Sequence, residues 1–360
     1  MKSALNWQEA TVIALREVTP TVREFTLLPP EGAQPHEPGS HLQVQIGVAS
    51  TATSGTGLRL HTRSYSLIGL PNAQPNHQAA KPAKPANPGY RIAVKRLDDG
   101  RGGSLAMWRL AVGDRLRITP PQNHFPLDLM APAYLLVAGG IGITPLLGMA
   151  QALAARGASV RLCFGARSDD ELAYWPDLQA ALGTNAQAAL ASRGEMIPLA
   201  KEIASLPVGA QMYVCGPVPL LDAARRTWAQ AGRPLSGLRY ETFGSSGRFA
   251  PQAFNVKVPR HQLAFAVPQD AGLLDCLERE GIQALYDCRR GECGLCAMDV
   301  LSLQGEIDHR DVFLSDDEKS SNKRICVCVS RVVASMDGAA GGVGEITLDS
   351  AYRPEASSVG

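Results

Sequence analysis

The sequence lacks a dominant charge, a disulfide-rich composition and a long apolar run. Its 35 Lys and Arg against 34 Asp and Glu give a net charge of +1, so no basic excess indicates nucleic acid or an anionic membrane as a partner. Eight cysteines in 360 residues are too few for a disulfide scaffold. The apolar stretch at 134–150 is shorter than a membrane span needs, and residues 1–9 lack the apolar core of a signal peptide. We therefore expect a cytoplasmic protein whose thiols are free or bound to metal.

Length and composition instead fit a folded protein of several domains. The chain is 45% hydrophobic and 19% charged, which supports full-sized hydrophobic cores. Its 360 residues correspond to two or three domains at roughly 150 residues each.

Residues 1–128 show the pattern of a β domain. Short apolar or alternating runs stand between clusters of Gly, Pro and Asn, as in a barrel or sandwich. Two segments interrupt these runs, a Ser/Thr/Gly-rich one at 49–57 and a proline-bearing one at 71–88, and we expect both to be exposed loops. The expected strands are Thr11–Arg16, Val22–Leu28, Leu42–Ile46, Ser64–Ile68, Tyr90–Arg96 and Arg115–Thr119.

Residues 129–243 alternate strands with helices, which predicts a doubly wound α/β domain with a parallel sheet. The run Tyr134–Ala138 is apolar throughout, as a strand buried on both faces requires. The other expected strands are Val160–Phe164, Gln211–Cys215 and Leu238–Phe243, and the expected helices are Thr144–Arg156, Asp170–Leu182 and Pro219–Ala231.

A linker at 244–250 precedes a third domain at 251–360. The linker begins Gly-Ser-Ser-Gly, a composition typical of flexible connections. The third domain is expected to contain a hairpin (Asn255–Val258 and Gln262–Val267), a helix (Leu273–Glu280), a glycine-rich loop at 338–344 and a strand (Glu345–Leu348).

Cysteines of the third domain carry the most specific motif in the sequence. Cys288-x4-Cys293-x2-Cys296, followed by Cys326 and Cys328, has the spacing of a plant-type [2Fe–2S] site. The alternatives are a structural zinc site and scattered buried thiols. A zinc site usually pairs one CxxC with a second CxxC or a His pair at short range, and the sequence has neither. Spacing does not choose between Cys326 and Cys328 as the fourth ligand, because residues two apart on a strand point to the same face.

A glycine-rich turn follows the first buried strand of the α/β domain. Gly139, Gly140 and Gly142 would let the backbone approach a pyrophosphate, and the helix that follows offers free N–H groups. The turn is not the GxGxxG fingerprint, so a plain tight turn remains an alternative. Gly216 and Pro217 end another strand at the same expected edge of the sheet, where open α/β folds bind ligands.

Two short motifs of the β domain are suited to a phosphate and a flat ring. Arg63-Ser64-Tyr65-Ser66 places a guanidinium, which grips phosphates through its planar fork, beside an aromatic side chain. Gly102-Gly103-Ser104 offers backbone amides and a hydroxyl. Each motif alone is more often a plain turn or strand, so their weight lies in their combination.

Together these motifs resemble the phthalate dioxygenase reductase family over nearly the whole chain. They are Arg-x-Tyr-Ser, Gly-Gly-Ser, Gly-Gly-Ile-Gly-Ile-Thr-Pro, Cys-Gly-Pro and the C-terminal cysteine cluster. The resemblance implies a multidomain protein with an FMN-binding antiparallel β-barrel (1–128), an NADH-binding α/β doubly wound parallel sheet (129–243) and an α+β β-grasp ferredoxin-like domain with an extra tail (251–360). The segments at 49–57, 72–89 and 337–344 and the tail after residue 350 depart from the family's pattern.

The resemblance also implies roles for individual residues. The residues expected to hold FMN are Arg63, Ser64, Tyr65, Ser66, Ala93, Val94, Lys95, Gly102, Gly103 and Ser104. Those expected at the nicotinamide nucleotide are Gly139, Gly140, Gly142, Gly216 and Pro217, with Thr144 and Cys215 flanking the nicotinamide and Phe243 shielding the flavin. The implied cluster ligands are Cys288, Cys293, Cys296 and Cys328. Cys328 is preferred to Cys326 because Cys-Val-Ser-Arg at 328–331, with His-Arg-Asp at 309–311, matches the family's ending.

The implied function is that of an oxygenase reductase. A nicotinamide gives up two electrons together and a [2Fe–2S] cluster takes one at a time, whereas a flavin exchanges both kinds. The expected partners are NADH and a terminal Rieske non-haem iron oxygenase, with the chain a monomer that binds neither nucleic acid nor membrane. The alternatives are a stand-alone NAD(P)H–flavin reductase and a redox-sensing flavin/iron–sulfur protein.

Three surface features leave two interpretations each. Arg167 and Ser168 would hold a 2′-phosphate or form a solvated turn, and we expect NADH rather than NADPH. The acidic run 316–318 would steer a basic partner or begin a solvated helix. His309 is expected to be a surface turn residue rather than a ligand.

Overall fold

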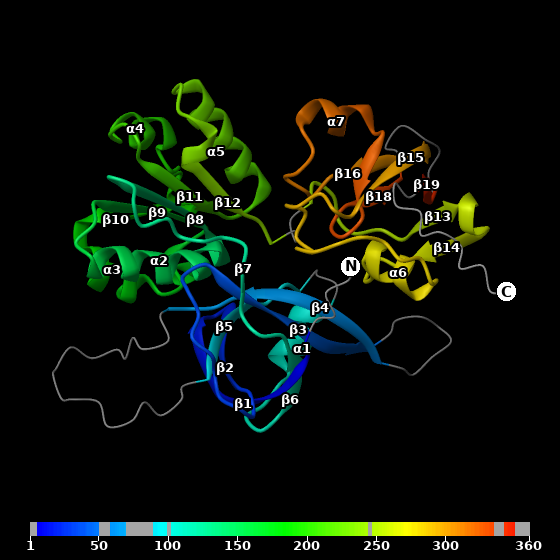
Figure 1. Ribbon diagram of the computed structural model, residues 1–360, viewed down its shortest axis with the longest axis horizontal. Helices are drawn as coiled ribbons and strands as arrows, with labels where there is room; N and C mark the ends of the chain where they lie inside the picture. Colours follow the sequence, from blue (N-terminus) through cyan, green and yellow to red (C-terminus); the bar gives the residue numbers. More distant parts are fainter. Residues whose placement is uncertain are drawn as a thin grey trace. The chain divides into compact units, whose positions relative to one another are not determined.

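The computed structural model describes residues 6–49, 58–69, 89–98, 102–243, 247–334 and 342–349. The chain divides into two compact units, one within Ser3–Glu241 and the other within Thr242–Gly360 (Figure 1). The first unit therefore holds both the predicted β domain and the predicted α/β domain. The predicted loops at 49–57, 71–88 and 338–344, and the tail, lie largely outside the described residues.

The first part of the chain forms a seven-stranded antiparallel barrel. The strand order is β4-β3-β6-β1-β2-β5, with β7 beside β3, and a bridge between Leu67 and Ile92 connects the end of β4 to β5. Alternate side chains such as Leu42, Val44 and Phe25 are fully buried inside it, as strand geometry requires. Its elements are β1 (Gln8–Thr19), β2 (Val22–Leu28), β3 (Ser40–Ala49), β4 (Leu58–Ser66), β5 (Tyr90–Lys95), α1 (Gly103–Trp108), β6 (Arg115–Ile118) and β7 (Gln122–Asn123).

The next part is a parallel sheet covered by helices. Its strand order is β10-β9-β8-β11-β12, and every pair is parallel. Helix α2 packs against α3 and α4 against α5, one pair on each face of the sheet (Figure 1). The predicted doubly wound fold is confirmed. Its elements are β8 (Tyr134–Gly139), α2 (Ile143–Ala155), β9 (Val160–Ala166), α3 (Trp175–Leu182), β10 (Ala186–Leu190), α4 (Leu199–Ala204), β11 (Gln211–Cys215), α5 (Val218–Gln230) and β12 (Leu238–Glu241).

The predicted helix Asp170–Leu182 is wrong in its first half. A short 3-10 helix spans Asp169–Glu171 in place of the predicted first turns. Helix α3 begins only at Trp175. Tyr174 between them has φ of +61°, outside the helical region. Strand β10 and helix α4 were not predicted, because both are short and the sequence of β10 is mostly alanine.

The second unit contains a mixed five-stranded sheet with one helix packed on it, as in the predicted α+β β-grasp domain. The strand order is β14-β13-β19-β15-β17, in which β13 and β19 are parallel. A separate pair of strands, β16 and β18, lies beside it. The elements are β13 (Phe254–Val258), β14 (Leu263–Val267), α6 (Leu273–Arg279), β15 (Ala297–Gln304), β16 (Glu306–Asp308), α7 (Asp316–Ser321), β17 (Arg324–Cys326), β18 (Arg331–Val333) and β19 (Gly344–Asp349).

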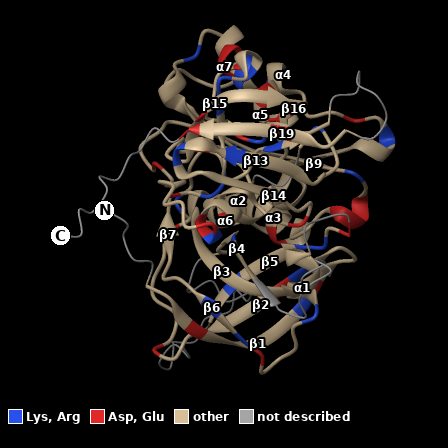
Figure 2. Cartoon of the chain, turned by 90° about the vertical axis from the view of Figure 1, so that its right-hand side faces the viewer, with Lys and Arg blue, Asp and Glu red and all other residues tan. Residues whose placement is uncertain are grey.

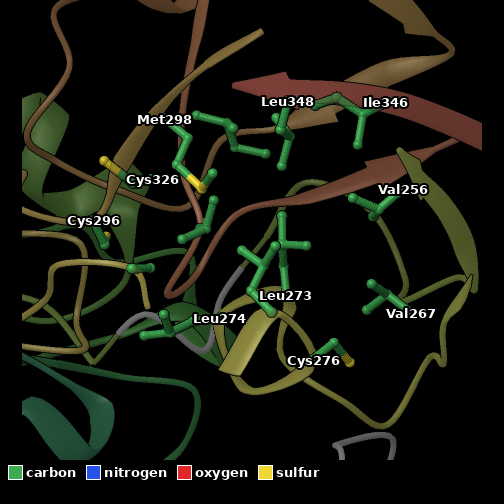
Figure 3. Close-up of a cluster of buried hydrophobic side chains, with 14 of the residues drawn as sticks. Val256, Val267, Leu273, Leu274, Cys276, Cys296, Met298, Cys326, Ile346 and Leu348 are labelled. Carbon is green, nitrogen blue, oxygen red and sulfur yellow. The ribbon is translucent and has the colours of Figure 1, made fainter. Parts of the chain in front are cut away.

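The core of this unit lies between α6 and the five-stranded sheet. Figure 3 shows Leu273 of α6 pointing toward the strands that carry Val256 and Leu348, and all three side chains are at most 1% exposed. Cys296 and Cys326 lie at one end of the same cluster, and Cys276 lies at the other (Figure 3). The hydrophobic core of this unit therefore extends to the cysteine loop and packs against it.

Charges of both signs are interspersed along the described residues of both units (Figure 2). This distribution agrees with the net charge of +1. Among the helices that the structure describes, none is long and apolar enough to cross a membrane.

Candidate functional site

The glycine turn after β8 is shaped by contact with the end of β11. A Cβ at Gly142 would lie 2.2 Å from the carbonyl oxygen of Cys215, and one at Gly139 would lie 3.3 Å from Gly216 Cα. Gly140 has φ of +54° and open space around its Cα. Gly139 and Gly142 therefore allow the ends of β8 and β11 to pack closely. Gly140 instead leaves open space on the other side of the turn.

Thr144 and Cys215 lie at these two neighbouring strand ends, as predicted. Thr144 stands in the first turn of α2, is 2% exposed and donates its hydroxyl to the carbonyl of Ile141 at 3.0 Å. Cys215 is the last residue of β11 and is fully buried. The structure thus brings a hydroxyl and a thiol to the carboxyl edge of the sheet, where open α/β folds bind ligands.

Arg63 of β4 lies beside the start of α1. A Cβ at Gly103 would stand 3.5 Å from Arg63 Nε. The guanidinium is held in place by a bond from Nη1 to the Thr62 carbonyl at 2.8 Å and by contact of Nη2 with His61 Nδ1 at 3.0 Å. Ser104 instead exchanges hydrogen bonds with the backbone of Leu97, at 3.1 Å from its amide and 3.4 Å from its carbonyl.

The end of β4 carries a buried hydroxyl that suits a bound ring. Ser66 is 4% exposed, and among the described residues its Oγ has no hydrogen-bond partner. A buried polar group without a protein partner is costly and calls for an explanation, of which a bound ligand is one. Burial raises the pKa of the adjacent Tyr65 to about 12, which keeps its phenol neutral. These residues, with Arg63, fit a flavin that carries a phosphate.

The predicted flavin-contacting residues of β5 face different ways. The Val94 side chain packs in the barrel core and its carbonyl accepts a bond from Trp108 Nε1 at 3.0 Å. Lys95 Nζ forms an ion pair with Glu171 Oε2 at 3.1 Å. Val94 thus has only its backbone available for a ligand, whereas Ala93 and Lys95 lie on the other face of the strand.

The cysteine loop wraps Cys288 with backbone amides. The amides of Arg290, Glu292 and Cys293 lie 3.4, 3.4 and 3.5 Å from Cys288 Sγ. Gly291 has φ of +79°, and a Cβ there would lie 2.7 Å from Val329 Cγ2. This glycine is therefore required both by backbone conformation and by the close approach of the 327–329 turn.

Five thiols of this unit, those of Cys288, Cys293, Cys296, Cys326 and Cys328, influence one another's pKa. A hydrogen bond with Cys288 lowers the pKa of Cys293 to about 6. Hydrogen bonds with Cys326 and Cys328 lower the pKa of Cys296 to about 4. Within the described residues, no three His, Cys, Asp or Glu side chains gather as a single metal ion would need. These neighbouring thiols, in the Cys-x4-Cys-x2-Cys spacing of the sequence, fit the ligand set of a [2Fe–2S] cluster.

The two candidates for the fourth ligand do not lie on one strand. Cys326 is the last residue of β17, fully buried in the core, while Cys328 is partly exposed in the turn that follows. The premise that both point to one face of a strand is therefore wrong. The turn that carries Cys328 is the one that touches Gly291 of the cysteine loop through Val329.

The His-Arg-Asp segment at 309–311 holds this turn in place. Ser330 Oγ donates to Asp311 Oδ1 at 3.2 Å and accepts from the amide of Arg310 at 3.1 Å. Val312 donates its amide to the carbonyl of Gly291 at 2.9 Å. The prediction that His309 is a surface residue is wrong, because its side chain is 9% exposed and its Nδ1 lies 3.5 Å from Asp311.

Two arginines that support the cluster loop were not predicted. Arg289, with φ of +51°, pairs with Asp275 and Glu278 of α6 at 2.8 and 2.7 Å. Arg331 is 1% exposed and donates to the carbonyls of residues 252, 268 and 271. Burial lowers the pKa of Arg331 to about 10, so it stays charged at neutral pH. These pairings depend on tertiary contacts, which local sequence patterns do not predict.

Comparison with known proteins supports both sites. Residues 136–226 match the oxidoreductase NAD-binding domain, and residues 256–333 match the 2Fe-2S iron-sulfur cluster binding domain. The chain is 35% identical over 326 residues to the heme-dependent oxidative N-demethylase beta subunit of Ectopseudomonas mendocina (strain ymp), covering 90% of this chain and 95% of the relative. The chain belongs to the phthalate dioxygenase reductase-like family.

A further relative and a solved structure are similar to this chain over two thirds of its length or more. A putative toluene-4-sulfonate monooxygenase system reductase subunit of Comamonas testosteroni is 39% identical over 246 residues, covering 67% of this chain and 76% of the relative. The solved structure of phthalate dioxygenase reductase, described as modular for electron transfer from pyridine nucleotides to [2Fe-2S], is 28% identical with a TM-score of 0.72. It covers 96% of this chain and 98% of its own. The chain is thus an oxidoreductase with the predicted fold layout of a barrel, an NAD-binding parallel sheet and a 2Fe-2S ferredoxin fold.

Proposed function

We propose that this chain takes electrons from NADH, holds FMN in its barrel, and passes electrons singly through a [2Fe–2S] cluster to a separate Rieske non-haem iron oxygenase. The observation that carries the proposal is the cysteine loop, whose backbone amides surround Cys288 Sγ, on a chain that matches both a 2Fe-2S binding domain and an NAD-binding domain. A flavin accepts a hydride and releases electrons one at a time, which links the two-electron donor to the one-electron cluster.

The chain's own residues bind and orient the three groups. Arg63 with Gly102 and Gly103 would hold the FMN phosphate, while Tyr65 and Ser66 contact its ring. The Arg63 guanidinium is already directed by Thr62 and His61, which supports this assignment. The nearby Ser64, Ala93 and Lys95 would complete the flavin site.

The nucleotide would lie along the carboxyl edge of the parallel sheet. Gly139, Gly140 and Gly142 with Gly216 and Pro217 would admit the pyrophosphate, and Thr144 and Cys215 would flank the nicotinamide. Phe243 would shield the flavin. The buried positions of Thr144 and Cys215 suit a site from which water is excluded.

NADH is the proposed donor rather than NADPH. Arg167, which could accept a 2′-phosphate, lies 3.6 Å from the Glu171 carboxylate. Ser168 bonds to Asp170 at 2.5 Å, and Asp169 also stands in this turn. Glu171 thus engages Arg167, and Asp170 adds a negative charge to this turn, which disfavours a 2′-phosphate there. Comparing kcat/KM for the two nucleotides tests this, and equal values would contradict it.

Cys288, Cys293, Cys296 and Cys328 would bind the cluster. Cysteine ligands must stay reduced, and the cytoplasm keeps thiols reduced. We therefore propose a cytoplasmic location. We also propose that the chain acts as a monomer, away from membranes and nucleic acid. The partner is proposed to be a Rieske oxygenase. The E. mendocina relative is named as a subunit of a heme-dependent oxidative N-demethylase, so a heme-dependent partner is the alternative to test.

Cytochrome c reduction provides the test of this function. The purified chain should reduce cytochrome c with NADH, and Cys293→Ser should abolish this while NADH still bleaches the flavin. Extraction should release FMN, not FAD. Equal cytochrome c reduction by wild type and Cys293→Ser would favour a stand-alone flavin reductase. No reduction of either the flavin or cytochrome c by NADH would favour a redox sensor.

A further inference from the structure

The junction between the barrel and the NAD-binding domain contains a buried carboxylate that none of the proposed cofactor contacts uses. Glu24 of β2 is 6% exposed. Its oxygens accept from Arg91 Nε at 3.0 Å, from Arg91 Nη2 at 2.9 Å and from Arg16 Nη2 at 2.9 Å. The Tyr174 hydroxyl donates to the same carboxylate at 2.8 Å. The arginines belong to the barrel, whereas Tyr174 belongs to the NAD-binding domain.

Tyr174 has an unusual backbone conformation. Its φ of +61° lies in the left-handed region, which a residue with a side chain rarely adopts. Such a conformation persists where the surroundings hold it. Tyr174 is 3% exposed, and Arg16 lies over its ring at 5.6 Å from the centroid. The contacts with the barrel therefore contribute to holding this residue in place, beside the bond from the Leu178 amide to its carbonyl.

A second contact joins the same segment to the barrel. Glu171, three positions before Tyr174, pairs with Lys95 of β5 at 3.1 Å. Both side chains are largely shielded, at 14% and 23% exposure, so this pair is screened less than a surface one. Residues 167–174 are thus fixed to the barrel at two points.

This segment adjoins the elements that form the two proposed ligand sites. It follows β9 at the carboxyl edge of the sheet, and β9 is the neighbour of β8, which ends in the glycine turn. Its barrel contact, Lys95, lies on the strand proposed to line the flavin. A shift of the segment would therefore move the nucleotide side of the site relative to the flavin side.

We propose that Tyr174 is a positioning residue: its bond to Glu24 fixes the segment 167–174 on the barrel and thereby sets how the nicotinamide meets the flavin. The inference rests on the proposed function. It goes beyond that function by assigning the alignment of the two sites to a hydroxyl–carboxylate bond outside both of them.

Removal of one hydroxyl tests the inference without collapsing the fold. In Tyr174→Phe, Glu24 keeps its three bonds from Arg16 and Arg91, so no buried charge loses all its partners. Tyr134→Phe is the matched control. The Tyr134 hydroxyl also makes one hydrogen bond, in which it accepts from the Ala131 amide at 3.0 Å, but it lies at the opposite end of β8 from the glycine turn.

The first readout needs neither flavin nor nucleotide. Hydrogen exchange on the flavin-free protein should speed up in the 167–174 segment of Tyr174→Phe, while β8 and the barrel strands keep wild-type protection. Tyr134→Phe should leave this segment at the wild-type rate. Equal protection of the segment in all three proteins would overturn the inference.

The second readout separates alignment from binding. In anaerobic stopped-flow, flavin reduction by saturating NADH should slow about tenfold to a hundredfold in Tyr174→Phe, since a displacement near 1 Å costs about that much. The Kd for NAD⁺ should stay within about twofold of wild type. Wild-type reduction rates in Tyr174→Phe would overturn the inference. Failure of wild-type protein to be reduced by NADH would instead refute the proposed function.

Discussion

Gly142 stands directly against the backbone of Cys215, because a Cβ at position 142 would lie 2.2 Å from the Cys215 carbonyl oxygen. The glycine pattern after β8 is therefore a packing requirement between two strand ends as well as a candidate phosphate cradle. Thr144 and Cys215 are brought to one sheet edge by that contact.

Gly142→Ala should destabilise the first unit by about 2 kcal/mol, because the new methyl group meets backbone atoms that cannot turn away. Gly140→Ala is the control, since its Cα faces open space and only its positive φ opposes a side chain, at a cost of about 1 kcal/mol. Urea unfolding measures both. A smaller loss for Gly142→Ala than for Gly140→Ala would contradict the packing argument.

Cys328→Ser should abolish the visible absorption of the cluster, while Cys326→Ser should retain it. Cys328 lies in the turn against the cluster loop, and Cys326 is packed in the core at the end of β17. Cys326→Ser should cost stability, since a hydroxyl replaces a buried thiol. Absorption spectra of the two purified variants decide the ligand, and the reverse pattern would exchange their roles.

Arg63→Gln should weaken FMN binding by about tenfold to a hundredfold, because a charged hydrogen bond to the phosphate is lost. Arg117→Gln on β6 of the same barrel is the control, and its FMN affinity should stay at the wild-type value. Titrating flavin-free protein with FMN, followed by fluorescence quenching, gives both constants. Equal affinities in the two variants would remove Arg63 from the flavin site.

Acid should destabilise the wild-type chain more than Glu24→Gln. Burial alone would raise the pKa of Glu24, but bonds from Arg91, Arg16 and Tyr174 bring it below its ordinary value. A carboxylate with a lowered pKa in the folded state adds stability above its unfolded pKa, near 4.3, and loses it as the pH falls through the folded value.

The Glu24 contribution can be followed by unfolding midpoints. At pH 7, Glu24→Gln should lower stability by about 2 kcal/mol, because the partly buried Arg91 loses its counter-charge, while Arg16 stays half exposed to water. The difference between the two proteins should shrink as the pH falls below about 4. A constant difference across this range would show that the Glu24 charge contributes no stability.

Much of this architecture could be predicted where local pattern and tertiary packing agree. Strand β2 was predicted at Val22–Leu28 and β11 at Gln211–Cys215, because their apolar runs end at turn residues. Helix α3 was predicted too long, because its first turn is replaced by the left-handed Tyr174, which contacts Glu24 across 150 positions of sequence.

The cluster site was likewise predicted in part: its ligand motif was found from the sequence, but its supporting residues were not. The cysteine spacing predicted a [2Fe–2S] site, and the family match supports it. The sequence did not indicate the support from Arg289 or the burial of His309, since these depend on Asp275, Glu278 and Asp311, which come together only in the fold.

Anaerobic titration of the purified protein with NADH, followed by visible absorption and low-temperature EPR, tests the central claim most directly. The account predicts bleaching of the flavin together with a rhombic signal from a reduced [2Fe–2S] centre. Flavin bleaching without that signal would contradict it, because the cysteines would then hold something other than an electron-accepting cluster.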